Sequence, residues 1–382
     1  MKKKILLILS YILVAVVAVQ WTMILTAPRE PEYEKLLELE ALVQEKYIDE
    51  VDKAAIEDAA AAAMVEALGD RWSYYIPAGE YASYLEGIAN AYVGIGITIT
   101  PAEDGSGVEV MVVDENGPAD IAGMEVGDVI VAVDSTRIAG MDTTQIRDMV
   151  RGQAGTSVEI TVRRGGEELM LPMTRAYVET PVATAKMLED GIGLVTIVNF
   201  DSRCADETLA AIESLLAQGA EKLIFDVRNN PGGYASELVR VLDYLLPEGE
   251  LFRTVNYQGK EAVDMSDEAY LDIPMAVMVN KDSYSAAEFF AAALQEYEAA
   301  VIIGEQTSGK GYFQSTFSLK DGSAVGLSIG KYFTPKGISL EGVGITPDVE
   351  VSVDEETYWA IYYGQLASED DPQLRAAIDA LK

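Results

Sequence analysis

The hydrophobic pattern of the chain changes three times along its length. An uncharged apolar run covers residues 5–27, and residues 30–85 then place apolar side chains at helical spacing. From residue 92 the spacing shortens to the alternation typical of strands, and after Pro181 strand-like and helix-like stretches follow one another. These patterns predict a multidomain protein of α/β and α+β class, with a transmembrane helix, a helical region, a strand-rich domain and a layered α/β domain.

The first 28 residues carry the features of a membrane anchor. Lys2, Lys3 and Lys4 precede an apolar run of 23 residues, and about 20 apolar residues span a bilayer. A cleavable signal is the alternative, but its apolar run is usually about 7–15 residues long, and here Pro28 follows the small residue Ala27. We expect a retained single-pass anchor in the cell membrane with the remaining chain extracytoplasmic, because flanking lysines favour the cytoplasmic side.

Residues 29–88 are predicted to be helical. Asp49 and Asp52 separate two apolar-periodic stretches, and Gly69 follows the second one as a helix stop. The apolar face of the first stretch, which includes Leu36 and Val43, either packs on its own domain or pairs with a second copy in a homodimer.

Composition excludes several kinds of chemistry. The formal net charge of −35 disfavours nucleic-acid binding. The chain contains no histidine, which removes the Ser-His-Asp arrangement and the common zinc sites, so we expect no metal and no cofactor. Its single cysteine, Cys204, is interpreted as a small buried side chain.

Three motifs follow predicted strands of the α/β domain. They are Asn229-Asn230-Pro231-Gly232-Gly233, then Ser283-Tyr284-Ser285 at the start of a helix, and then Gly309-Lys310-Gly311. Adjacent glycines can aim backbone amides at one oxyanion, and a helix start suits a nucleophilic serine. Taken singly, the three motifs also fit a tight turn, a helix cap and a solvated loop.

Lys310 could serve as a base only if burial or a nearby cation lowered its pKa from about 10.4. A phosphate-binding loop is the competing interpretation, because residues 304–310 fit the start of that pattern. Gly311 lacks the hydroxyl that the pattern requires next, and residues 312–317 have strand character rather than helix character. These two departures argue against a nucleotide site.

Residues 92–173 form a strand-rich domain with predicted strands at 92–100, 108–113, 129–133, 158–162 and 169–173. The segment from Gly117 to Ile130, with its sequence GPADIAGMEVGDVI, strongly resembles PDZ domains. The resemblance implies a domain over residues 89–178 that binds peptide carboxyl termini by strand addition. It implies that the terminal carboxylate is held by backbone amides around Val93, Gly94, Ile95 and Gly96.

The three motifs, taken in order after a PDZ domain, resemble the carboxy-terminal processing peptidases, or tail-specific proteases. The likeness extends to the segments 68–70, 332–335 and 342–349. It implies a peptidase core of crotonase-like fold over residues 179–365, followed by a helical tail over 366–382. Carried over by position, the nucleophile falls on Ser285, the general base on Lys310 and a lysine-orienting glutamine on Gln314.

The resemblance further implies an oxyanion hole made by the amide of Ala286 and one amide from Gly232 or Gly233. Tyr284 and Ala287 depart from the family's serine-rich turn, and Tyr284 is expected to narrow the pocket. Glu288 and Glu296 are predicted to face solvent. The implied activity is cleavage of proteins near their carboxyl ends, and the alternative is an inert scaffold that binds peptides through its PDZ domain.

Overall fold

The computed structural model describes residues 33–382, and the chain divides after Met64 into two units. The first unit contains α2 (Glu34–Lys46), which buries no side chain, and most of α3 (Lys53–Glu66), an alanine-rich helix. The predicted anchor lies outside the described residues. Within residues 33–382, no helix combines the length and the apolar character needed to cross a membrane.

After the predicted helix stop at Gly69, the region 29–88 that the sequence predicts to be helical also contains a strand. The segment contains the short strand β1 (Tyr74–Ile76) before α4 (Ala78–Ile88). β1 pairs antiparallel with β18 (Ala324–Phe333), about 250 residues downstream. Local spacing cannot reveal a strand whose only partner lies so far along the chain.

The predicted PDZ domain contains a six-stranded antiparallel sheet in the order β3-β4-β5-β7-β8, with β6 beside β5. A separate ribbon pairs β2 with β9. The predicted strand at 92–100 divides at Ile95-Gly96, where Gly96 has φ +76°, into β2 and β3. The elements are β2 (Ala91–Gly94), β3 (Ile97–Pro101), β4 (Val108–Val113), α5 (Pro118–Ile121), β5 (Val129–Val133), β6 (Thr136–Arg137), α6 (Thr143–Val150), β7 (Ser157–Arg164), β8 (Glu167–Thr174) and β9 (Ala176–Glu179).

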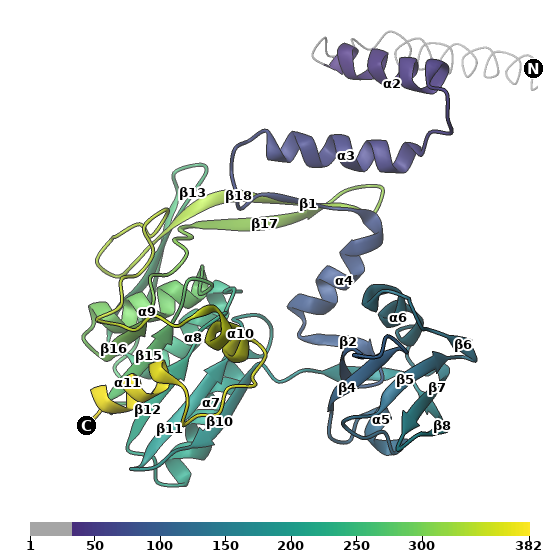
Figure 1. Ribbon diagram of the computed structural model, residues 1–382. Coiled ribbons are helices and arrows are strands. Elements are labelled where there is room, and N and C mark those ends of the chain that lie inside the picture. The colour runs from purple at the N-terminus through teal and green to yellow at the C-terminus, as the bar shows by residue number, and fades with distance from the viewer. Residues whose placement is uncertain (1–32) are drawn as a thin grey trace, which may run out of the picture. The chain divides into compact units, whose positions relative to one another are not determined.

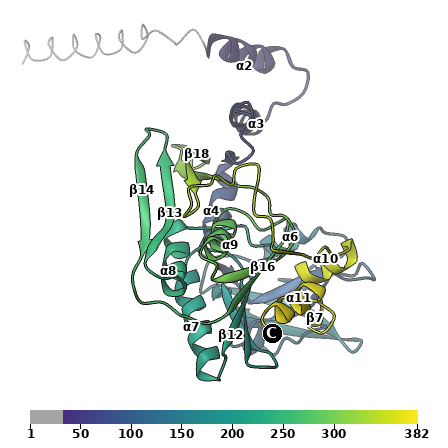
Figure 2. The same ribbon diagram turned by 90° about the vertical axis from the view of Figure 1, so that its left-hand side faces the viewer.

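The α/β core is built on a second six-stranded sheet in the order β10-β11-β12-β15-β16-β19, parallel except for β10. Helices α7, α8 and α9 bury an apolar cluster against one face, and α11 buries a smaller one against the other (Figures 1 and 2). The elements are β10 (Ala183–Met187), β11 (Ile192–Ile197), α7 (Cys204–Ala217), β12 (Lys222–Asp226), α8 (Ala235–Leu245), β15 (Met275–Val279), α9 (Ala286–Glu296), β16 (Ala300–Gly304), β19 (Val349–Glu350), α10 (Glu355–Tyr362) and α11 (Pro372–Ala380).

A third sheet is antiparallel and carries β1 in the order β1-β18-β13-β14, with β17 beside β18. Its remaining strands are β13 (Gly249–Asn256), β14 (Glu261–Ser266) and β17 (Tyr312–Ser318). Because β17 begins two residues after Lys310, this sheet fixes one end of the lysine loop.

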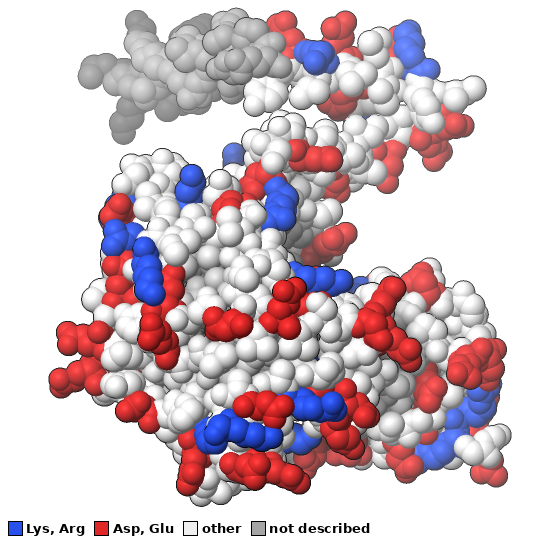
Figure 3. All heavy atoms as spheres, turned by 60° about the vertical axis from the view of Figure 1, so that its left-hand side comes forward, with Lys and Arg blue, Asp and Glu red and all other residues white. Residues whose placement is uncertain are grey.

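The surface carries an excess of acidic side chains, as the net charge requires. Figure 3 shows Asp and Glu spread over the visible face with fewer Lys and Arg between them. Such a surface repels phosphate backbones.

Candidate active site

The three predicted motifs meet at one edge of the core sheet. Strands β12, β15 and β16 are parallel neighbours, and one of the three motifs follows the carboxyl end of each strand. Because the carboxyl ends of parallel strands lie along the same edge, the loops 227–234, 280–285 and 305–311 become adjacent.

Hydrogen bonds join the first two loops. The amide of Asn229 donates to Oδ1 of Asn280 (2.9 Å), and Nδ2 of Asn280 donates back to Oδ1 of Asn229 (2.8 Å). Oγ of Ser283 donates to the carbonyl of Val227 (2.7 Å). The first serine of the turn is therefore a structural link, and Ser285 is the one left to face the cleft.

Ser285 occupies a strained turn at the amino terminus of α9. Its backbone has φ 58° and ψ −125°, a region that costs a non-glycine residue about 1–3 kcal/mol. The side chain is buried yet lines the cleft described below. The next amide, that of Ala286, is the first of the helix and has no acceptor within residues 33–382.

The two glycines of the Asn-Asn-Pro-Gly-Gly turn have different roles. A Cβ on Gly232 would lie 2.7 Å from Cβ of Ser285, so only glycine permits this approach. The amide of Gly232 already donates to Oδ1 of Asn230 (2.8 Å). The amide of Gly233 has no acceptor in the described chain, which narrows the predicted choice between the two glycines to Gly233.

Lys310 lies on a loop that requires its two flanking glycines. A Cβ on Gly309 would approach the amide of Val343 to 2.9 Å, and one on Gly311 would approach the amide of Glu341 to 2.5 Å. The Lys310 Nζ lies 5.1 Å from the ring centre of Trp72 and 5.6 Å from that of Tyr284. Burial lowers the pKa of Lys310, and the carboxylates of Glu288, Asp70 and Glu341 oppose that change.

A segment upstream of the PDZ domain holds this loop from the other side. The Arg71 guanidinium donates to the carbonyls of Ser308 (3.1 Å) and Gly309 (2.9 Å). Nε1 of Trp72 donates to Oε1 of Glu341 (3.1 Å), whose Oε2 also accepts from the amide of Gly311 (2.8 Å). Residues 70–73 therefore form one wall of the lysine environment.

The prediction that Glu288 faces solvent was wrong. Its side chain is fully buried and accepts from the amides of Ser285 (3.0 Å), Gly309 (2.7 Å) and Lys310 (2.8 Å) and from the Thr307 hydroxyl (2.5 Å). Burial raises the pKa of Glu288, and these hydrogen bonds oppose the rise. Since all four partners donate, the ionised carboxylate fits the site.

Glu296 also accepts hydrogen bonds, although the sequence predicted that it faces solvent. Its carboxylate accepts from the Thr334 hydroxyl (2.7 Å) and from the amide of Lys336 (2.7 Å), and the residue is half-buried. It lies at the far end of α9 from Ser285 and takes no part in the cleft.

The loops enclose a cleft of about 660 Å³. Its lining includes Ser285, Lys310, Gln314, Gly232 and Gly233, and Tyr284 also borders it, as the sequence suggested. Gln314 follows a bulge in β17, and its Nε2 donates to the carbonyl of Tyr312 (3.2 Å) and to the Ser328 hydroxyl (3.0 Å). Its predicted action on Lys310 therefore stays a prediction.

Asp201 lines the same cleft and was not predicted. Its amide donates to Oδ1 of Asn199, and it follows Phe200, which forms a bridge with Gly233. Burial raises the pKa of Asp201 to about 7, which places a titrating carboxyl beside the glycine turn at neutral pH.

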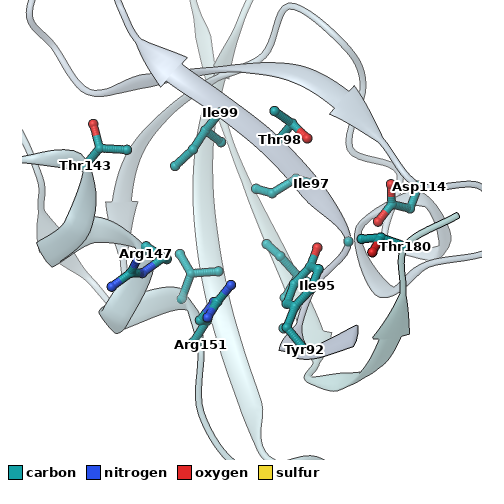
Figure 4. A pocket seen from close by; sticks show the side chains of 13 residues that line it. Tyr92, Ile95, Ile97, Thr98, Ile99, Asp114, Thr143, Arg147, Arg151 and Thr180 are labelled. Atoms are coloured by element: carbon teal, nitrogen blue, oxygen red, sulfur yellow. The ribbon is translucent and has the colours of Figure 1, made fainter. Parts of the chain in front are cut away.

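The predicted carboxylate loop borders a groove of about 310 Å³ between β3 and α6 (Figure 4). Gly94, Ile95 and Gly96 line it, whereas Val93 pairs with Tyr177 in the β2–β9 ribbon. Tyr92 lies across this end of the groove. Burial and the Asp114 carboxylate raise the pKa of Tyr92, and hydrogen bonds from the amides of Ile97 and Gly96 oppose the rise.

Some of the unpredicted residues had a sequence signal. The pattern Ser285-x-x-Glu288 at a helix start is typical of a capping box, in which the Glu288 side chain turns back toward the Ser285 amide. The segment 68–70 is part of the resemblance to tail-specific proteases, but no local sequence pattern indicates that Trp72 lies close to Lys310. Asp201 had no signal, because its position depends on the bridge to Gly233.

Comparisons with known proteins agree with this geometry. Residues 191–351 match peptidase family S41, and residues 109–164 match a PDZ domain. The chain is 29% identical over 368 residues to the "Probable CtpA-like serine protease" of Staphylococcus saprophyticus, covering 94% of this chain and 74% of that relative. It is 32% identical over 294 residues to the protein of the same description in Staphylococcus epidermidis, covering 76% and 59%.

A solved structure of an S41 protease from Bacteroides fragilis superposes with a TM-score of 0.51 at 17% identity, covering 78% of this chain and 87% of that one. This likeness concerns the fold.

Proposed function

The chain belongs to peptidase family S41 and is a serine-type peptidase, and on this premise we propose that it cleaves polypeptides near their carboxyl ends with a Ser285-Lys310 pair. The observation that carries the proposal is the shared cleft. A serine in a strained helix-start turn and a half-buried lysine with a lowered pKa line one cavity of about 660 Å³.

In the proposed reaction, neutral Lys310 takes the Oγ proton of Ser285 as that oxygen bonds to the scissile carbonyl carbon. The oxyanion is held by the amides of Gly233 and Ala286, which have no other acceptor in the described chain. The Lys310 ammonium then gives its proton to the leaving amine as the C–N bond breaks. Water, deprotonated by Lys310, attacks the resulting ester, and Ser285 recovers its proton from the lysine.

Two further features supply what this chemistry requires. The Trp72 and Tyr284 rings keep water from the lysine, which supports the uncharged amine that a base needs. The PDZ groove offers a free strand edge, so we propose that it captures the substrate tail and either presents it to the cleft or gates the cleft.

The proposed site of action is the outer face of the cell membrane. This rests on the lysine-flanked apolar run 5–27. Retention of the full chain in membranes washed with alkaline carbonate, together with digestion of its catalytic part by protease added outside intact cells, would support it. Release by the wash would contradict it.

Replacing Ser285 by alanine, and separately Lys310 by alanine, should each abolish cleavage of an unfolded protein substrate. The exposed lysine of the neighbouring loop provides a matched control, so Lys281→Ala should retain activity. A serine-directed acylating reagent should label the wild-type chain at Ser285. Activity in the Ser285→Ala or Lys310→Ala variant would refute the pair, and absence of labelling with intact tail binding would favour the scaffold alternative.

A further inference from the structure

The PDZ groove is open along one side of its sheet. Strand β3 lies at the end of the strand order, so its outer edge can pair with an added strand, which would displace the Tyr92 hydroxyl from the Ile97 amide. Helix α6 forms the opposite wall. Figure 4 shows Ile97 and Ile99 on the strand side and Arg147 and Arg151 on the helix side, all directed toward the groove.

The two arginines differ in the number and kind of contacts that their guanidinium groups make with other side chains. Arg151 pairs with Glu86 at 3.2 Å, and its guanidinium lies 5.0 Å from the ring centre of Tyr92. Among residues 33–382, the Arg147 guanidinium bonds only to the adjacent Asp148, at 2.9 and 3.0 Å, and both of these side chains are exposed. Because such exposed pairs contribute little, Arg147 can be recruited by a ligand.

The spacing of side chains along α6 and along an added strand indicates which residue of a bound tail would lie opposite each arginine. Side chains on one face of an added strand are about 6.8 Å apart, close to the rise of one helical turn, about 5.4 Å. A tail whose carboxylate meets the amides of Gly96 and Ile97 has its last side chain near Val150 and Arg151. The next side chain on that face, two positions earlier, comes opposite Arg147.

We propose that this groove selects polypeptide tails with an apolar last residue and an acidic residue two positions before it, and that Arg147 recognises the acidic side chain. The inference rests on the proposed function, in which the PDZ domain binds substrate tails. The apolar preference follows from Ile95, Ile97 and Val150 in the lining.

One acidic side chain of the lining must be weighed against this. Asp114 borders the carboxylate loop, where a Cβ on Gly96 would meet its side chain at 3.2 Å. Its repulsion acts on the terminal carboxylate, which every tail carries. It therefore lowers the affinity of all tails alike and leaves the discrimination between them to Arg147.

The test measures the binding of fluorescent peptides to the full chain carrying Ser285→Ala, which prevents cleavage. The peptides share an apolar last residue and differ only two positions before it, where they carry Glu, Gln or Lys. We expect the Glu peptide to bind about fivefold tighter than the Gln peptide and the Lys peptide to bind weakest. Added salt should reduce the difference.

Arg147→Glu should reverse the order so that the Lys peptide binds best. The matched control is Arg137→Glu in the same domain, because Arg137 pairs with Glu168 and does not line the groove. It should keep the wild-type order.

The outcomes separate the two levels of the proposal. If the peptides bind equally well with a free and an amidated carboxyl end, or not at all, tail recognition itself fails. If tails need a free carboxylate but Glu, Gln and Lys peptides bind alike, the proposed function stands and this inference is refuted. A Glu preference that survives Arg147→Glu would refute the role of Arg147.

Discussion

The catalytic cleft and the PDZ groove differ in how far their charged side chains are shielded from water. In the cleft, the carboxylate of Glu288 is fully buried and links the Ser285 turn to the Lys310 loop through four hydrogen-bond donors. In the groove, Arg147 is exposed and forms an ion pair with its neighbour Asp148. One site depends on excluding water, and the other remains open to it.

This difference sets the expected size of substitution effects. A buried charge that loses its partners keeps its full desolvation cost, whereas an exposed pair is already solvated. Changes in the cleft should therefore act in a nearly all-or-none way on activity. Changes in the groove should alter affinity by small factors.

The largest effect is expected for Glu288→Gln. The glutamine side chain would place an NH2 donor against hydrogen-bond donors, where a carboxylate oxygen now accepts. The free energy of unfolding should therefore fall by about 3 kcal/mol. Activity should fall below detection, because Glu288 holds both the Ser285 turn and the Lys310 loop. Urea unfolding and a peptidase assay measure the two effects.

The control is Glu296→Gln on the same helix, where the half-buried carboxylate accepts from Thr334 and Lys336. It should cost less than about 1 kcal/mol. If Glu288→Gln proved equally mild and active, the contrast between cleft and groove would be wrong.

An intermediate effect is expected for Trp72→Ala. Burial lowers the pKa of Lys310, so cleavage should increase with pH as the amine loses its proton, with an inflection below the usual lysine value. Removing the ring admits water, which should move the inflection to higher pH and reduce kcat/KM at neutral pH about tenfold. The pH profile of kcat/KM measures both.

Trp72→Phe keeps an aromatic wall and should stay close to the wild-type profile. Trp359→Phe, at an exposed position of α10, is the control. A shift of the inflection to lower pH in Trp72→Ala would contradict this account, because it would show that the ring acts chiefly by attracting the ammonium.

The smallest effect belongs to the groove. Tyr92→Phe removes the hydroxyl that receives hydrogen bonds from the amides of Ile97 and Gly96. Tail peptides should then bind about fivefold tighter, since their carboxylate no longer competes with the phenol. Tyr177→Phe, on the exposed face of the neighbouring strand β9, should leave affinity unchanged. Weaker binding in Tyr92→Phe would mean that the hydroxyl assists the tail.

Much of the fold follows from local pattern. The strands at 108–113 and 129–133 match their predicted limits, because each is a short apolar run bounded by turn residues. The helix predicted to start at the Ser283-Tyr284-Ser285 motif is present as α9, which begins at Ala286, and this prediction also rested on local sequence. Prediction failed for β1, a three-residue strand whose partner β18 lies about 250 residues downstream.

The sequence by itself determined the chemistry available to this protein: without histidine, a serine hydrolase must use another base, and Lys310 between two glycines is the one its motifs offer. Tertiary structure decided what surrounds that lysine. Trp72 precedes it by more than 200 residues and Glu288 lies on helix α9, yet the Trp72 ring borders the Lys310 amine and Glu288 accepts a hydrogen bond from the Lys310 amide. Burial is a property of the assembled chain, so the lowered pKa on which the proposed reaction depends arises only when these distant segments close around one amine.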